Sequence, residues 1–112
     1  MIKDKSKQYF VRVPLTLLYD DRITKSALLL YAVLMDTADQ YGMQIVDIDT
    51  LAARCRCSGK TVRRAEAQLC AAGYISVYRT GRASLIQLTD TELIRSSSGI
   101  QAYRATSKAK EA

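Results

Sequence analysis

The chain has 112 residues, 48% of them hydrophobic, which is enough for one domain with a single modest core. Its 17 lysines and arginines exceed its 11 aspartates and glutamates, and the resulting charge of +6 favours a polyanionic partner; a solvated basic surface without a partner is the alternative. No apolar run approaches the roughly 20 residues of a membrane span, and the first ten residues lack the apolar stretch of a secretory signal, so we predict a cytoplasmic protein.

The residue types argue against catalysis and metal binding. The chain contains no histidine, so it lacks the commonest general base and the usual partner of a nucleophilic cysteine. Its 3 cysteines are too few for a structural zinc site without histidine, and their spacing predicts free thiols: Cys55, Cys57 and Cys70. We predict no enzyme, no metal and no cofactor, with Cys57 as an apolar plug between two helices.

The first third of the chain predicts a loose start followed by one dominant helix. Residues 1–8 are polar and are expected to be flexible. Residues 9–14 alternate apolar and polar side chains, which predicts an extended segment, and residues 15–22 form a turn that can be helical. Thr24 then caps a helix expected from Lys25 to about Tyr41. Its apolar residues 27–34 cover every side, so this helix should be central and buried, with any surplus available for a dimer contact.

A pair of shorter helices follows a brief extended piece at residues 43–48. Asp47 is placed to accept the N–H of Thr50 and so to begin a helix over residues 48–55. Ser58 caps the next helix after a tight connection. That second helix is expected from Gly59 to Ala72, ended by Gly73 where the chain must turn left-handed.

The chain then predicts a hairpin. Two strand-like runs, residues 74–79 and 83–89, are joined by a turn around Gly81. Residues 90–112 offer one weak helical turn and are expected to be weakly helical or disordered. Two helices joined by a tight turn and followed by a hairpin predict a mainly α winged helix-turn-helix, a three-helix core plus wing over residues 9–89.

The second helix of the pair has two unlike faces. At about 100° per residue, Val62, Ala65 and Leu69 form a buried stripe. The opposite side is basic at its start and small at its end, which suits a helix entering a DNA major groove by its amino end: Lys60, Arg63, Arg64, Ala67 and Ala71.

Neighbouring residues extend this basic surface. Arg54 and Arg56 flank the turn, Arg79 and Arg82 bracket the wing, and Ser58 and Thr61 lie at the positive end of the helix dipole. Glu66 is the only acid between Arg54 and Thr89. The predicted DNA-binding residues are Lys60, Thr61, Arg63, Arg64, Ala67, Arg54, Arg56, Ser58, Arg79 and Arg82. The alternatives are a solvated helix face, wing arginines that keep the hairpin soluble, and Ser58 as a plain cap.

The segment LAARCRCSGKTVRRAEAQLCAAGYI, residues 51–75, resembles bacterial winged helix-turn-helix domains, including GntR-type repressors. Residues 9–39, YFVRVPLTLLYDDRITKSALLLYAVLMDTAD, resemble the amino-terminal domain of RepA-type replication initiators of plasmids and phages. This resemblance implies double-stranded DNA binding, often as a homodimer on repeated sites, in replication initiation or transcriptional regulation. It places Lys60, Thr61, Arg63 and Arg64 in the contacting positions. Initiators usually continue into a further domain, so a fragment or a stand-alone regulator is expected.

Two other functions fit the same residues. The domain could be an interaction module for replication proteins, whose basic face gives only non-specific DNA affinity. It could also sense oxidation through its cysteines, which would require an exposed thiol of lowered pKa.

Overall fold

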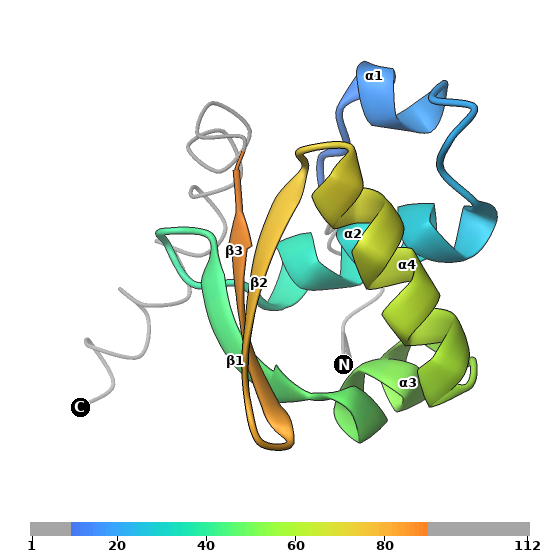
Figure 1. The fold of residues 1–112 in the computed structure, drawn as a ribbon. Helices are drawn as coiled ribbons and strands as arrows, with labels where there is room; N and C mark the ends of the chain where they lie inside the picture. The colour runs from blue at the N-terminus through green and yellow to red at the C-terminus, as the bar shows by residue number, and fades with distance from the viewer. Residues whose placement is uncertain (1–9, 90–112) are drawn as a thin grey trace, which may run out of the picture.

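The computed structural model describes residues 10–89, and the predictions for residues 1–8 and 90–112 lie outside them. Within this range the chain forms helices and one 3-stranded antiparallel sheet (Figure 1). Helices α2, α3 and α4 lie on one side of the sheet. In chain order the elements are α1 (Leu15–Leu18), α2 (Lys25–Thr37), β1 (Met43–Asp47), α3 (Ile48–Cys55), α4 (Gly59–Ala71), β2 (Ile75–Thr80) and β3 (Ala83–Leu88).

The three predicted helix caps are confirmed. The hydroxyl of Thr24 accepts from the amide of Ala27 at 3.3 Å and begins α2. The Asp47 carboxylate accepts from the amide of Thr50 at 2.7 Å and begins α3. The hydroxyl of Ser58 accepts from the amide of Thr61 at 3.1 Å and begins α4. Each cap satisfies an amide that has no acceptor within its own helix, so these positions fix where the helices begin.

The predicted end of α2 is wrong. The helix ends at Thr37, with Ala38 as its extended cap, and does not continue to Tyr41. The reason is Asp39, whose carboxylate accepts from the amides of Tyr41 and Met43 at 2.8 and 2.9 Å. A side chain that satisfies these amides locally competes with the helix and favours a turn.

The sheet order is β1-β3-β2, so β1 joins the predicted hairpin as a third strand. The hairpin itself is confirmed, with strand ends within one residue of the prediction. Thr80 pairs with Ala83, and Gly81 in the two-residue turn has φ of 62°. A positive φ at this place suits glycine, because it has no Cβ.

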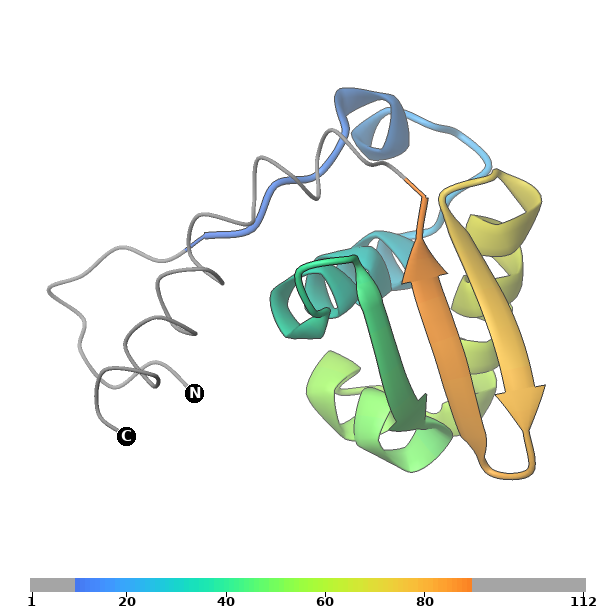
Figure 2. The same cartoon turned by 90° about the vertical axis from the view of Figure 1, so that its left-hand side faces the viewer.

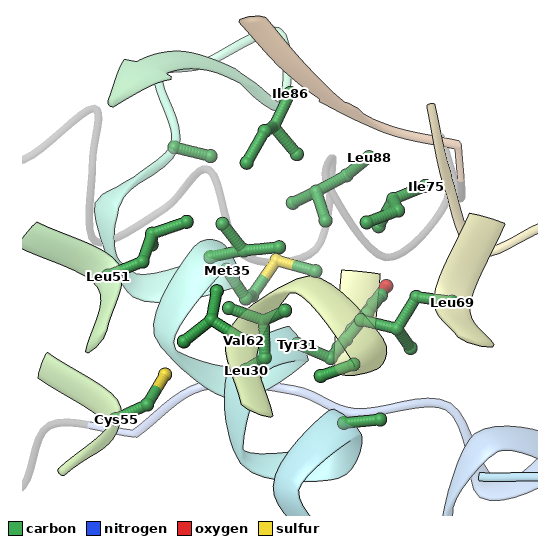
Figure 3. Packing of buried hydrophobic residues seen from close by; sticks show 14 of the residues in the cluster. Leu30, Tyr31, Met35, Leu51, Cys55, Val62, Leu69, Ile75, Ile86 and Leu88 are labelled. Atoms are coloured by element: carbon green, nitrogen blue, oxygen red, sulfur yellow. The ribbon is translucent and has the colours of Figure 1, made fainter. Parts of the chain in front are cut away.

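The core lies between the helices and the inner face of the sheet (Figure 3). Helix α2 contributes most of its centre, which confirms that it is the central helix, although Leu29 on its outer side stays 46% exposed. Tyr31 of α2 meets Tyr74 edge to face, with ring centroids 6.2 Å apart. The predicted stripe of Val62, Ala65 and Leu69 is buried, so α4 has one fixed orientation.

The turn between α3 and α4 depends on Arg56. This residue caps α3 with φ of 54° and ψ of 46°, the only positive φ outside glycine among residues 10–89. The conformation lets the amide of Cys57 reach the carbonyl of Ala52 at 3.1 Å. Cys57 is partly buried against the core, as predicted for a plug, while Cys55 lies deeper.

The conformation of Arg56 gives a test of the turn. We expect the Arg56→Gly variant to be more stable than the Arg56→Val variant, with a free energy of unfolding higher by about 1 kcal/mol or more. The reason is that a left-handed backbone conformation is unfavourable for a β-branched side chain. Urea denaturation measures the difference. At Arg54, which is helical, the same pair of substitutions should rank in the opposite order. Equal stabilities of the two Arg56 variants would contradict the left-handed turn.

Candidate nucleic-acid interface

The outward face of α4 carries the predicted basic residues. Lys60, Arg63, Arg64 and Ala67 are all exposed, opposite the buried stripe. Burial of that stripe leaves the other side of a straight helix in solvent, so the arginines and the lysine share one face. The structure therefore brings these four residues together as the sequence predicted.

The start of α4 is an anion-attracting helix end. The hydroxyl of Ser58 accepts from the amide of Thr61 at 3.1 Å and lies 3.0 Å from the Thr61 hydroxyl. The Ser58 hydroxyl thus satisfies a helix amide, which confirms its capping role. The first amides of the helix and its dipole favour a negative group at this end. Arg54 and Arg56, both exposed, flank it.

The wing presents its two arginines differently. Arg82 is exposed in the turn at the tip of the hairpin. Arg79 faces the helices, because its partner in the register is Ser84, which is buried on the inner face of β3. Its Nη2 donates to Oε2 of Glu66 on α4 at 2.6 Å. Arg79 is thus an ion-pair partner as well as a basic residue of the wing.

Glu66 is the residue that the sequence reasoning missed. It lies about 40° from Val62 on a helical wheel, directly beside the stripe predicted to be buried, so the same geometry could have found it. Its side chain is only 2% exposed. Burial raises the pKa of this carboxyl, while Arg79 and Arg63 nearby act in the opposite direction.

The burial of Glu66 decides the charge of the surrounding surface. It is the only acid between Arg54 and Thr89, and its carboxylate is turned inward onto Arg79. Every exposed charged side chain in residues 54–89 is therefore positive. A surface of one sign attracts a polyanion, whereas an ordinary solvated surface mixes both signs.

Cys55 and Cys70 are not reactive thiols of lowered pKa. Burial raises the pKa of Cys55 from the ordinary 9.0 to about 11. Desolvation of the sulfur also raises the pKa of Cys70, although the residue as a whole is exposed. Both directions are opposite to those of a redox sensor. Within residues 10–89, no three Cys, Asp or Glu side chains form a possible metal site, and no helix is long and apolar enough to cross a membrane.

The thiols give a second test. At pH 8 we expect iodoacetamide to label Cys55 about 100-fold more slowly than an ordinary thiol, because a pKa of about 11 lowers its thiolate fraction to that extent. Mass spectrometry of peptides follows each site. In urea, Cys55 should react like Cys70. Rapid labelling of Cys55 in the folded protein would contradict its burial.

Comparison with known proteins agrees with this architecture. Residues 21–75 match the family model described as a helix-turn-helix domain. This range runs from before α2 to the first residue of β2. No curated protein is significantly similar to the chain in sequence.

Two solved structures are similar to the chain. One is a possible transcriptional regulator from Methanosarcina mazei Go1, with a TM-score of 0.51 and 17% identity, covering 80% of this chain and 78% of that one. The other is MepR, a transcription regulator of the Staphylococcus aureus multidrug efflux pump MepA, with a TM-score of 0.49 and 17% identity over 85% and 68% of the two chains. At this identity the first likeness is one of fold, and the second is too distant to support a conclusion. The chain is a winged helix-turn-helix, with α3 and α4 as its helix pair and the β2–β3 hairpin as its wing.

Proposed function

We propose that this protein binds double-stranded DNA sequence-specifically, with α4 in the major groove. One observation carries the proposal: residues 54–89 expose positive charge only, and the densest part of it lies on the free face of the second helix of a helix-turn-helix. Lys60, Arg63 and Arg64 are long enough to reach base edges and phosphates, and Ala67 lets the helix lie close to the bases.

The other basic residues have positioning roles in this proposal. The amides at the start of α4, with Arg54 and Arg56, bind backbone phosphates and hold the register. Arg82 at the wing tip follows the backbone or the minor groove. Thr61, with its hydroxyl beside Ser58, is a further phosphate donor. The function requires binding alone, so we propose no catalytic activity and no cofactor.

The biological process we propose is regulation of transcription. The helix-turn-helix family match and the fold shared with a possible transcriptional regulator support it. Initiation of replication on a plasmid, phage or other mobile element is the second candidate, and its support is the resemblance of residues 9–39 to RepA-type initiators. Both processes use the same contact surface, so the identity of the bound site distinguishes them.

The first experiment is selection of bound duplexes from a random pool at near-physiological salt. We expect one enriched motif, and we expect Arg64→Ala to bind it more weakly by about 1 to 3 kcal/mol if the arginine pairs with a guanine. Arg12→Ala is the matched control, because Arg12 is exposed on the segment that Figure 2 shows on the opposite side of the molecule from α4. Absence of any enriched motif would refute specific reading by this chain.

The interaction-module alternative differs in its salt dependence. A protein that makes six or more phosphate contacts should lose roughly a thousandfold in affinity between 50 and 200 mM salt. Docking on a replication protein through the apolar surface would change little over this range. We favour direct DNA binding because the exposed side chains of α4 are charged and small, and an apolar docking surface is absent from this face.

A homodimer would place two reading helices on a repeated site. We propose that its interface is the outer face of the sheet, where Ile45 and Tyr78 lie on either side of Leu85 in the register. Ile45 is 75% and Tyr78 is 69% exposed, although both side chains are large and apolar. Two chains of charge +6 repel each other. The strands of this face carry one charged residue, Asp47, within residues 10–89, so two copies can meet here at a low electrostatic cost.

The dimer proposal is tested by replacing both large residues with lysine. Sedimentation equilibrium should give a dimer for the native chain and a monomer for Ile45→Lys/Tyr78→Lys, with an unchanged circular dichroism spectrum. Leu29→Lys, on the exposed side of α2, is the control and should remain dimeric. A native chain that is monomeric at high micromolar concentration would refute the dimer. A dimer that is lost only in the Leu29→Lys variant would place the interface elsewhere.

A further inference from the structure

The pair formed by Glu66 and Arg79 joins the proposed reading helix to the wing. Arg22 and Asp20 make the other ion pair among residues 10–89, and they lie two residues apart in one loop. Glu66 and Arg79 therefore form the one ion pair in the described structure that ties two elements together.

We propose that Glu66 is a positioning residue, which holds Arg79 and thereby sets the angle of the wing relative to α4. This role rests on the proposed DNA binding and adds to it: α4 and the wing would both contact DNA, and their relative orientation would depend on a residue that does not itself touch DNA. Glu66 itself is buried and carries the wrong sign for a phosphate contact.

The position of the pair along the hairpin supports this role. Helix α4 packs against strand β2, and Leu69 and Ile75, near the point where the two elements are joined, are both buried in the core. Arg79 lies further toward the tip, and only Thr80 follows it before the Gly81–Arg82 turn. Strand β3 is paired with β1 as far as Ala83, so only the Gly81–Arg82 turn extends beyond the ladder. At about 3.3 Å per residue this turn lies roughly 5 Å beyond Arg79, so the orientation of Arg79 bears directly on that of Arg82.

The cost of burying the Glu66 carboxylate indicates that it does not serve to stabilise the fold. Oε2 receives the Arg79 hydrogen bond, whereas Oε1 is buried with no hydrogen-bond partner among the described residues. An apolar residue in the same stripe as Val62 and Leu69 would avoid that desolvation cost, and such replacements of buried ion pairs are often neutral or stabilising. What an apolar residue cannot supply is the directed hydrogen bond to the arginine.

The pair also leaves Arg79 capable of a second contact. A guanidinium has five N–H donors, and Glu66 uses one of them in the structure. The Arg79 side chain is 40% exposed, so its other donors can reach a phosphate. Glu66 thus orients the Arg79 side chain from the buried side and leaves the remaining guanidinium donors facing the solvent.

The first arm of the test needs no DNA. Nuclear magnetic resonance measures the backbone order of residues 79–83 and the contacts between α4 and β2 in the native chain, in Glu66→Leu and in Glu66→Gln. We expect Glu66→Leu to remain folded, with lower order at the wing tip and altered contacts near Arg79. Glu66→Gln should keep most of the native signals, because its amide oxygen still accepts from Arg79. A wing unchanged in Glu66→Leu would overturn the inference.

The second arm measures affinity for the selected duplex and for a random duplex. By charge alone, removal of a carboxylate should tighten binding to both duplexes. If Glu66 positions the wing, Glu66→Leu should instead weaken binding to the selected duplex by about tenfold, with little loss on the random one. Glu66→Gln should recover most of that loss. Asp49→Leu removes an exposed carboxylate of α3 and is the control for charge.

The outcomes separate this inference from the proposed function. Tighter binding of Glu66→Leu to both duplexes, or an equal loss on both, would overturn the positioning role. If the native chain itself does not prefer any duplex, the proposed function fails, and the order of the wing in the first arm still decides whether Glu66 holds it. In the double variant Glu66→Leu/Arg79→Leu, the two losses should not add, because each substitution breaks the same contact.

Discussion

The burial of one stripe of α4 is the constraint on which the rest of this structure depends. Val62, Ala65 and Leu69 pack into the core formed around α2, so the helix cannot rotate about its axis. Because successive residues turn by about 100°, the fixed stripe determines what the opposite side exposes. The basic face of α4 is therefore held in place by apolar packing on the other side of the same helix.

The two ends of this helix are fixed by polar contacts. Ser58 caps its start, and Gln68 near its end accepts from the amide and the hydroxyl of Thr24 at 2.9 and 3.0 Å. The latter contact joins α4 to the beginning of α2, 44 residues earlier. Apolar packing sets the rotation of α4, and these directed hydrogen bonds set its position along the axis.

The wing is attached to the helices by one apolar contact and one ionic contact. Ile75 is buried in the core, whereas Arg79 meets the buried carboxylate of Glu66. Turning the single acid of residues 54–89 inward has two consequences: it ties the wing to α4, and it leaves the exposed surface with one sign of charge. The second consequence favours attraction to a polyanion over a distance set by the ionic strength.

The sequence by itself determined the elements that depend on neighbouring residues: the caps at Thr24, Asp47 and Ser58, the stripe and the basic face of α4, and the glycine turn of the hairpin. Each of these features depends on residues that lie within about four positions of one another in the sequence, so caps, turns and helical periodicity can be recognised from the sequence directly. The early end of α2 also has a local cause, the Asp39 turn, which the prediction overlooked. Only the tertiary structure decided the pairing of β1 with β3 and the choice of Arg79 as the partner of Glu66. The strand pairing and the ion pair join residues 13 or more positions apart, whose proximity follows from packing and leaves no periodic trace.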